Sequence, residues 1–599
     1  MSGTKYKCLL DVVNNAVTAM GKRYTKLALL NPSSCPKIIN SRLDNIDKLL
    51  LNNSYKDFPE KLSLISDIEK LKRKLNLNIL QPIEMADFIE SFIAIQTLLV
   101  DINKLKLNNI ITDKSIIKET EEFNKYIQEV FNKDILRQNT LRDIKSNFFN
   151  NNIDDKLDEI NNKFNREYNL ILDLQKKFIE VINQMNSIKK TKKKVVKKTK
   201  KTKEIKEEMN IDTSSYITIQ NTASEGYFLQ VSSQRYKAIE LFLKNYDNPA
   251  SDDEVDSDAE NIDFTTNLKL SELDIKQLKS VTKIFLKNKN TDNMTDIIEE
   301  LTKRVEEIYY IKLKEIHTQY SKLFDKVISV ITGFDYILSN AITANKYSYV
   351  RPKIMTNKNS YVSANNLRHP IVERLIDYEY IPHSIDLGNK LNGMLIYGLN
   401  SSGKSVLMKA VGLSVIMAQA GMYVPASDFE LSPYSSIYTR ITGNDNLFKG
   451  LSSFTLEMIE LNSIIKRARE DSLIIGDEVC RGTEHISGNA LVASTIVSLS
   501  KVKSSFIFAT HLHDLPKHID VKKEGVEEVR SSFSLGLSSS ISTFIGREQT
   551  SLLSVSVSGN PLSTSLKAFR NYCITSCRFR LLCKFGRAHY MQYFFSFFF

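Results

Sequence analysis

The segment "GLNSSGKS", Gly398 to Ser405, constrains the fold of this chain more than any other part of the sequence. Its two glycines are separated by four residues and followed by Lys and Ser, which is the pattern of a phosphate-binding loop. A short apolar run precedes it at residues 394–397, and an apolar helical pattern follows through Ala420. Glycines let backbone N–H groups surround phosphates, Lys404 reaches the β and γ phosphates, and the Ser405 hydroxyl ligates Mg²⁺. The sequence therefore predicts a strand, a loop that binds ATP phosphates and Mg²⁺, and a helix.

An acidic pair follows a second apolar run in "SLIIGDE", which ends with Asp477 and Glu478. Asp477 is suited to holding Mg²⁺, and Glu478 is suited to orienting and deprotonating an attacking water. The alternative is an acidic surface turn after a buried strand. A third apolar run, "FIFATH", ends in His511, which is a candidate sensor of the γ phosphate. The alternative for His511 is a structural role.

The segment "GLSSFTLEMIELNSIIKRARE", residues 450–470, predicts an amphipathic helix that begins at Ser452 and Ser453. One face of this helix carries its apolar residues, Phe454, Met458, Leu461, Ile465 and Ala468. A serine at a helix N-terminus is either an ordinary cap or part of an anion site. This segment lies between the phosphate loop and the acidic pair. Its position suggests a signature motif of the ABC type, which contacts the ATP of a partner subunit.

Most of the chain before the phosphate loop has a helical pattern. Residues 5–185 are rich in Leu, Ile, Lys and Asn, with apolar residues three and four apart, and residues 292–344 carry a long apolar stripe. Between them, residues 214–236 alternate aromatic and β-branched residues around Gly226, which predicts a hairpin or small sheet. From residue 348 to 518, short apolar strands alternate with amphipathic helices, which is typical of an α/β domain.

Charge is unevenly distributed in the middle of the chain. Residues 189–208 form a basic run that suits either a phosphate-backbone contact or a nuclear address, or else a solvated helix or hinge. Residues 251–260 form an acidic segment, predicted to be a solvated, disordered loop. The net charge of +12 over 599 residues is mildly basic and compatible with a polyanionic partner.

Composition also bounds the class of protein. A chain of 599 residues predicts three to five domains. The six cysteines have no disulfide-scaffold spacing, which favours a reducing, intracellular setting. No run approaches the roughly 18 apolar residues of a membrane span, so we expect a soluble protein with no membrane partner.

From about Leu9 to Leu515 the chain resembles the MutS family of DNA mismatch-repair ATPases. The resemblance begins with the segment from Leu9 onward, which is similar to the start of the MutS core domain. It continues with "LRHPIVE" and "YIPHSIDL" before the phosphate loop, and with "AQAGMYVPA", "IYTRITGNDNLFKGLSSFTLEM", "GDEVCRGTE" and "FATHLHDL" after it. The wording of "YGLNSSGKS" and "GDEVCRGTE" is most similar to the divergent branch of giant viruses and octocoral mitochondria.

This resemblance implies an α+β multidomain fold in which a helical core and lever carry an inserted β-rich clamp, followed by an α/β ABC-type P-loop ATPase domain. The implied parts are a helical core and ascending lever (1–212), a clamp with an acidic loop (213–285), a returning lever helix (286–347), the ATPase domain (348–529) and an atypical Ser-rich tail (530–599).

The resemblance also implies roles for single residues. Tyr380 is expected to pack on adenine, Ser452 to reach the ATP of the other subunit, and His511 to sense the γ phosphate. The residues expected to bind the nucleotide in the phosphate loop are Gly398, Asn400, Ser401, Ser402, Gly403, Lys404 and Ser405. Ser405 and Asp477 are the expected metal ligands, and Glu478 and His511 the expected catalytic residues.

Three departures from the family pattern limit what the resemblance implies. The sequence opens where the core domain begins, without the mismatch-reading and connector domains, so direct mismatch recognition is not carried over. Ser487 stands where the family usually has Asp before the glycine matching Gly488, which is expected to weaken communication between two ATP sites. From about Ser531 the texture becomes Ser-rich, and we interpret this tail as an out-of-frame or truncated end.

The leading hypothesis is an ATP-dependent DNA-binding protein of mismatch repair, with ATP and Mg²⁺ as cofactors. Its expected partners are double-stranded DNA, mismatched or branched, and a second MutS-type subunit in a homodimer or heterodimer. Its expected location is the nucleus or a cytoplasmic virus factory if the source is viral. The alternatives are a non-catalytic DNA-binding or scaffolding relic, or a MutS-like protein acting on branched DNA. An SMC-like ATPase fits poorly, because those proteins place the phosphate loop near the N-terminus.

Overall fold

The structure is a computed structural model that describes residues 5–51, 53–196, 217–222, 226–237, 239–240, 273–286, 290–357, 359–398, 402–441, 453–480, 485–515 and 524–530. The chain divides into two compact units. Unit 1 comprises Met1–Lys70, Glu90–Glu121 and Lys322–Phe599, and unit 2 comprises Leu71–Ile89 and Glu122–Ser321. The division into five parts made from the sequence stays a prediction, as do its boundaries.

The defining feature of unit 1 is a five-stranded parallel sheet with the order β10-β11-β12-β8-β13. The three strands in its middle, β8, β11 and β12, are buried at every position, as expected for a parallel sheet covered on both faces. The strands are β8 (Gly393–Tyr397), β10 (Ser436–Arg440), β11 (Ser472–Asp477), β12 (Ser505–Thr510) and β13 (Val526–Arg530).

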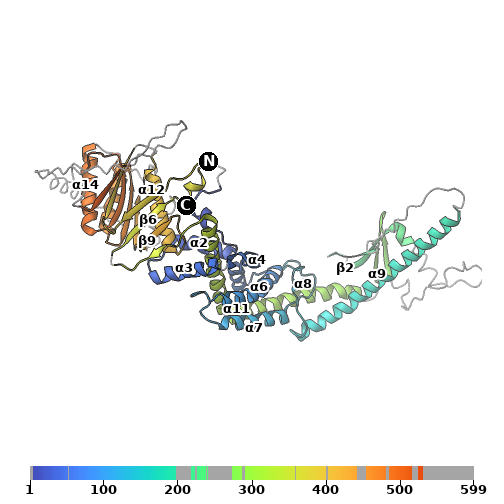
Figure 1. Cartoon of the computed structure of the whole chain (residues 1–599). Helices are drawn as coiled ribbons and strands as arrows, with labels where there is room; N and C mark the ends of the chain where they lie inside the picture. The colour runs from blue at the N-terminus through green and yellow to red at the C-terminus, as the bar shows by residue number, and fades with distance from the viewer. Residues whose placement is uncertain are drawn as a thin grey trace, which may run out of the picture. The chain divides into compact units, whose positions relative to one another are not determined.

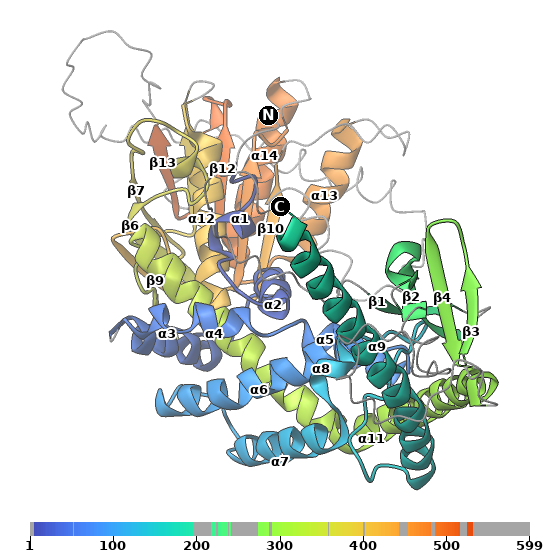
Figure 2. The same ribbon diagram turned by 90° about the vertical axis from the view of Figure 1, so that its right-hand side faces the viewer.

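Helices cover both faces of this sheet, with α12 on one side and α14 on the other (Figure 1). Neighbouring residues of β11 show the two faces. Ile474 belongs to the core formed with α13 and α14, whereas the Ile475 side chain lies against Gly412 of α12. Figure 2 shows α13 beside α14. The helices are α12 (Lys404–Ala420), α13 (Ser453–Arg467) and α14 (His485–Val502).

A second, four-stranded sheet in unit 1 has the order β5-β9-β6-β7. Its strands are β5 (Lys353–Ile354), β6 (Tyr361–Leu367), β7 (His383–Leu387) and β9 (Asp428–Ser432). Between β6 and β7 lies the short helix η4 (Val372–Arg374), and the buried His369 binds the backbone where η4 begins. The Nδ1 atom of His369 accepts hydrogen bonds from the backbone N–H groups of Ile371 and Val372, both at 3.2 Å. This segment is therefore held by a neutral imidazole.

The helical part of unit 1 is built around the C-terminal portion of α11 (Asn290–Tyr347). Asp335 on α11 accepts hydrogen bonds from the backbone N–H of Val17 and from the backbone and hydroxyl of Thr18, at 2.7–3.0 Å. Thr18 in turn caps α2. The other elements are α1 (Leu9–Val13), α2 (Ala19–Leu30), α3 (Pro36–Leu51), η1 (Ser54–Lys56), α4 (Pro59–Ser63), and parts of α5 (Ile68–Asn76), α6 (Pro82–Lys104) and α7 (Ser115–Val130).

The C-terminus of α12 is attached to these helices by hydrogen bonds. The carbonyl of Ala420 accepts from the guanidinium of Arg42 on α3 at 2.8 Å and from the hydroxyl of Tyr336 on α11 at 2.7 Å. Gly421 follows with φ of 80°, a left-handed C-cap that favours glycine. The helix that begins at the phosphate loop therefore ends on the helical part of the same unit.

Unit 2 combines long helices with a small antiparallel sheet of order β1-β2-β4-β3. Helix α9 packs on β1 and β2 (Figure 2). Arg304 of α11 forms an ion pair with Asp154, just before α9, at 2.5 Å. The elements are α8 (Lys133–Leu136), α9 (Asp155–Val196), β1 (Ile217–Thr222), β2 (Gly226–Ser232), β3 (Leu273–Gln277), β4 (Val281–Leu286), and the remaining parts of α5, α6, α7 and α11.

Several element predictions are confirmed. The long helix expected over 292–344 is α11, 58 residues long, and the hairpin expected around Gly226 is the antiparallel pair β1 and β2. Helix α9 includes the beginning of the basic run, up to Val196. The rest of that run, the acidic segment 251–260 and the tail from Ser531 lie outside the described residues. The mixed helix and sheet class is thus confirmed.

One expectation about apolar segments is wrong. Within the described residues, Asp296–Tyr347 of α11 is long and apolar enough to cross a membrane, with a mean hydropathy of 1.4 in its apolar window. However, 72% of that window is buried inside the protein. Burial of this kind is the pattern of a core helix, whose apolar face is covered by its own chain.

Two glycine substitutions test the packing around Asp335. A Cβ atom added at Gly21 on α2 would collide with the Asp335 carboxylate, which its hydrogen bonds hold in place. We expect Gly21→Ala to lower the free energy of unfolding by about 2 kcal/mol, despite the better helix propensity of alanine. Gly333→Ala on α11 is the matched control, because its Cβ would lie 3.5 Å from Ile110 Cδ1 in ordinary contact. Urea unfolding would contradict this packing if both variants were equally stable.

His369 should make stability depend on pH. Burial, and then the positive charge of Lys409, lower the pKa of His369 from 6.5 to about 4. Between these values the unfolded chain binds a proton that the folded chain excludes, so stability is lost as pH falls from about 6.5 towards 4. At pH 5 we expect a loss of about 2 kcal/mol relative to pH 7 from this group. His369→Asn keeps an acceptor for the backbone where η4 begins without titrating, so its unfolding midpoint should fall less on acidification than that of the wild type.

Candidate functional site

The candidate site lies where three neighbouring strands end. Asp477 at the end of β11 is paired with Ala509 of β12, and Thr510 of β12 is paired with Tyr397 of β8. Because the carboxyl ends of parallel strands share one edge of the sheet, the residues that follow them meet there. Gly398, Glu478 and His511 are those residues, so three motifs far apart in the sequence come together.

The phosphate loop is held by its own lysine. Lys404 is 6% exposed, and its Nζ donates a hydrogen bond of 2.7 Å to the carbonyl of Gly398. Burial lowers the pKa of Lys404, while the negative charges of Glu478 and Asp477 oppose that shift. Gly403 is the N-cap of α12 with φ of 89°, a left-handed conformation that favours glycine. Among the described residues, no atom lies within 4 Å of a Cβ added at Gly403.

The remaining loop residues are only partly described. Ser402 is buried, and Ser405 is the half-buried second residue of α12. Asn400, Ser401 and Ser452 lie outside the described residues. Their predicted roles stay predictions.

The acidic pair occupies two different environments. Asp477 is 7% exposed, and its Oδ1 atom is buried without a hydrogen-bond partner among the described residues. A buried carboxylate oxygen without a donor is a strong acceptor that a cation can satisfy. Glu478 follows in the left-handed region with φ of 49°, and its backbone N–H donates to the carbonyl of Ala509 at 3.0 Å. The turn directs these two adjacent carboxylates differently.

The side chains of Glu478 and His511 contact each other directly. The His511 Nε2 and Glu478 Oε1 atoms lie 3.2 Å apart, with 36% of the His511 side chain and 16% of the Glu478 side chain exposed. Nearby, the rings of His513 and Tyr397 stack with centroids 5.7 Å apart. An imidazole in direct contact with a carboxylate fixes the orientation of that carboxylate, which suits it to a role as a general base.

Tyr380 lies before β7, outside the contacts that join the other candidates. Its ring is half-buried and makes an edge contact with His383, with centroids 6.5 Å apart. Burial, and then the negative charge of Glu373, raise the pKa of the Tyr380 hydroxyl to about 12. The structure therefore gives Tyr380 a neutral phenol beside exposed apolar neighbours, Tyr378 and Ile381.

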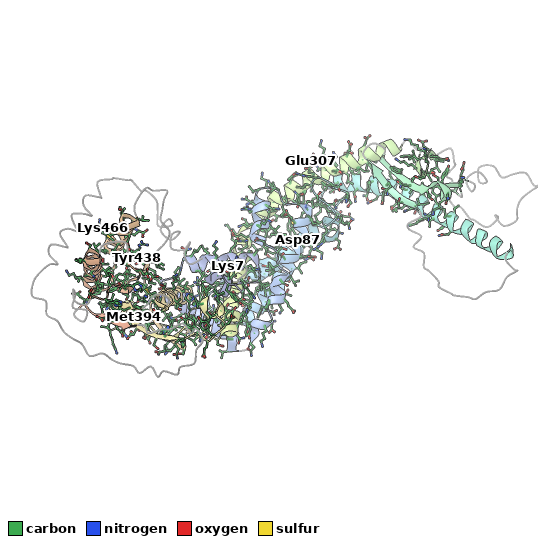
Figure 3. All side chains as sticks on the ribbon, turned by 90° about the horizontal axis from the view of Figure 1, so that it is seen from above. Lys7, Asp87, Glu307, Met394, Tyr438 and Lys466 are labelled. Atoms are coloured by element: carbon green, nitrogen blue, oxygen red, sulfur yellow. The ribbon has the colours of Figure 1, made fainter. Side chains whose placement is uncertain are left out.

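Sequence reasoning missed a buried acid beside the site. Glu457 on α13 is 6% exposed and accepts a hydrogen bond of 2.8 Å from the backbone N–H of Cys480. In Figure 3, the label Lys466 marks the C-terminal end of the helix that carries Glu457, and the label Tyr438 marks β10 in the same part of unit 1. The available signal was periodicity, because Glu457 lies three residues after Phe454 and four before Leu461, on the apolar face of the helix.

Two family models match the chain. MutS domain III matches residues 1–341, and MutS domain V matches residues 394–545. The site described above falls in the second range, apart from Tyr380. The first range includes the helical part of unit 1 up to residue 341 and all of unit 2.

Curated relatives give the same result. A protein of Acanthamoeba polyphaga mimivirus named as a mutS homolog is 32% identical over 563 residues, covering 87% of this chain and 48% of the relative. The mitochondrial DNA mismatch repair protein mutS homolog of Sarcophyton glaucum is 32% identical, covering 86% of this chain and 47% of the relative. The DNA mismatch repair protein MutS of Petrotoga mobilis is 25% identical, covering 86% and 55%.

The chain spans about half the length of these relatives. Two of these relatives come from a giant virus and an octocoral mitochondrion. They confirm the branch that was inferred from the residues of "YGLNSSGKS" and "GDEVCRGTE". Since one family model alone covers more than half of the residues, the chain belongs to the MutS family.

Proposed function

We propose that this chain is an ATP-dependent DNA-binding protein of DNA mismatch repair. It hydrolyses ATP at a composite dimer interface, and hydrolysis controls a clamp on DNA. The observation that carries this proposal is the joining of Lys404, Glu478 and His511 at one sheet edge, inside the range that matches MutS domain V. The relatives from Sarcophyton glaucum and Petrotoga mobilis are named as DNA mismatch repair proteins, which supports the choice of substrate.

The loop residues would bind and orient the triphosphate. Lys404, now bonded to the carbonyl of Gly398, would transfer its hydrogen bond to a phosphate oxygen when the nucleotide enters. The positive N-terminus of α12, which begins at the phosphate loop, favours the same anion. Tyr380 would supply an aromatic face for the adenine ring.

The residues present fit a magnesium ion. The buried Oδ1 atom of Asp477 without a hydrogen-bond partner and the hydroxyl of Ser405 at the helix N-terminus are the oxygen ligands that Mg²⁺ prefers. When bound there, the ion neutralises negative charge on the phosphates. Asp477 and Ser405 would thereby also fix the position of the phosphates relative to Glu478.

The attack on the γ phosphate would use Glu478 as the base. Its carboxylate would accept a proton from the water, while His511, 3.2 Å away, orients the carboxylate and contacts the phosphate. Only 16% of the Glu478 side chain is exposed, so bulk water has limited access to this carboxylate. Ser452 would complete the site of a second subunit.

The sheet of unit 2 would contact the DNA backbone. Lys276 of β3 and Lys283 of β4 are directly opposite each other, so two lysines lie on the same face of this sheet. Their ammonium groups lie over the rings of Phe285 and Phe228, at 4.9 and 4.7 Å from the centroids. Two neighbouring positive charges on one face of a sheet suit a phosphate backbone, which supports a polyanionic partner.

The assignment of Glu478 is tested by Glu478→Gln. Without a carboxylate to accept the proton, we expect ATP binding to persist and the turnover number to fall by roughly 1,000-fold or more. Glu528→Gln, at an exposed position of β13, is the control for a lost carboxylate. Phosphate release and binding of a fluorescent ATP analogue measure the two properties. Turnover near the wild-type value would remove Glu478 from its role, and a wild-type chain that binds ATP without hydrolysis would favour the non-catalytic relic.

The DNA contact is tested by replacing both Lys276 and Lys283 with Ala. We expect weaker duplex binding, with a salt dependence reduced in slope by about 1 for each lysine removed. Lys353→Ala is the control, because Lys353 is an exposed lysine of unit 1 paired with Asp428. Fluorescence anisotropy over a salt series, with homoduplex, mismatched and branched DNA, also establishes which substrate binds best. An unchanged slope would mean that this lysine pair does not contact phosphates.

A further inference from the structure

The turn that carries Glu478 is strained at two positions. Glu478 has φ of 49° and Cys480 has φ of 61°, and neither is glycine. Side chains with a Cβ atom disfavour this left-handed region, so such residues persist only where surrounding contacts hold them. A strained turn of this kind can relax to another conformation, and any relaxation would move the Glu478 carboxylate.

Backbone N–H groups of the turn donate hydrogen bonds to two neighbouring elements, β12 and α13. The backbone N–H of Glu478 donates to the carbonyl of Ala509 on the neighbouring strand β12 at 3.0 Å. The backbone N–H of Cys480 donates to the Oε1 atom of Glu457 at 2.8 Å. The first bond continues the pattern of the sheet, whereas the second depends on a single side chain from helix α13. Glu457 is thus the contact that a substitution can remove.

The Glu457 carboxylate is matched to this task by its surroundings. Cys480 is 2% exposed and Glu457 is 6% exposed, so their hydrogen bond is shielded from competing water. Arg440 at the end of β10 faces Glu457 with Nε 3.8 Å from Oε1, and it also faces Glu460 at 3.3 Å. Arg440 is paired with Gly476, directly before Asp477, so this positive charge lies beside the strand that leads into the turn.

The Cys480 thiol has no chemical role in this arrangement. Burial, and then the negative charge of Glu457, raise the pKa of the Cys480 thiol to about 12. The thiol therefore stays protonated and unreactive, and only the backbone N–H of Cys480 is used. What matters at position 480 is an amide that points at Glu457.

We propose that Glu457 is a positioning residue for ATP hydrolysis, acting through the backbone of Cys480 to hold Glu478 against His511. Glu457 lies on the helix that begins at Ser453, so the position of α13 is transmitted through one carboxylate to the turn that carries the base. This inference rests on the proposed function, because it assigns a second residue to the same reaction. Helix α13, at whose start the sequence suggests an ABC-type signature, would then be directly connected to the ATP site of its own subunit.

A purely structural role for Glu457 makes a different prediction. If Glu457 served only to balance the charge of Arg440 in the core, the charge of residue 457 would affect kcat and the length of its side chain would not. If it positions the turn, the acceptor oxygen must reach the Cys480 N–H, and the charge is secondary. Two conservative variants separate these properties. Glu457→Gln keeps the length and an acceptor oxygen but loses the charge, whereas Glu457→Asp keeps the charge but is one methylene too short to reach.

The experiment compares these variants of the full chain in steady-state ATP hydrolysis with Mg²⁺, with Glu460→Gln as the matched control. Glu460 lies about one turn further along α13 and faces Arg440, whereas the backbone N–H of Cys480 donates to Glu457. We expect Glu457→Asp to lower kcat by roughly 10- to 100-fold with KM for ATP little changed, because the base is misplaced while binding is kept. Glu457→Gln and Glu460→Gln should stay within about 3-fold of the wild type. Thermal unfolding confirms that each variant is folded.

The result that supports the proposal is a lower kcat in Glu457→Asp than in Glu457→Gln. Wild-type turnover in both variants, equal losses in both, or a greater loss in Glu457→Gln would overturn it. A loss expressed in KM alone would also overturn it, because positioning of the base acts on kcat. If the wild-type chain binds a fluorescent ATP analogue without any hydrolysis, the proposed function fails and the positioning role fails with it. If the wild type hydrolyses ATP but Glu457→Asp and Glu457→Gln have the same kcat, only the positioning role of Glu457 fails and the proposed function stands.

Discussion

Burial of β8, β11 and β12 on both faces is the constraint on which the candidate site depends. Helices cover the sheet on each side, so these strands cannot shift in register without exposing apolar side chains. The carboxyl ends of these strands are consequently fixed, which determines where the polar residues that directly follow them lie. Gly398, Glu478 and His511 meet because the apolar residues before them leave no alternative.

Beyond the strand ends, the site is held by polar contacts that the strands do not determine. Lys404 reaches back to Gly398, His511 reaches Glu478, and Glu457 reaches Cys480. Each contact involves a group that is largely removed from water, where hydrogen bonds are strong and unpaired groups are costly. The Oδ1 atom of Asp477 is buried without a hydrogen-bond partner among the described residues, and it lies where the proposed function needs a cation.

The sequence predicted the elements whose signals are local and periodic. The strands before Gly398, Glu478 and His511 were visible as apolar runs, and the stripe of α13 was visible from residue spacing, with Met458, Leu461 and Ala468 buried as expected. What escaped prediction depends on pairs distant in sequence. Asp335 binds the backbone at Thr18, and Glu457 binds Cys480, because the tertiary fold brings them together. Neither acid differs in sequence from an exposed one, except by its place on an apolar helix face.

The attachment of α12 at both ends has a mechanical consequence. The helix is 17 residues long and almost entirely buried, so it behaves as a stiff rod of about 25 Å. One end of the helix follows the phosphate loop. At the other end, the carbonyl of Ala420 accepts hydrogen bonds from Arg42 and Tyr336, which hold this end in place. A tilt of about 5° at the phosphate end would displace the far end by about 2 Å over that length. That displacement is comparable to the reach of one hydrogen bond, so a small tilt of this rod would either break the grip on Ala420 or carry α3 and α11 along with it.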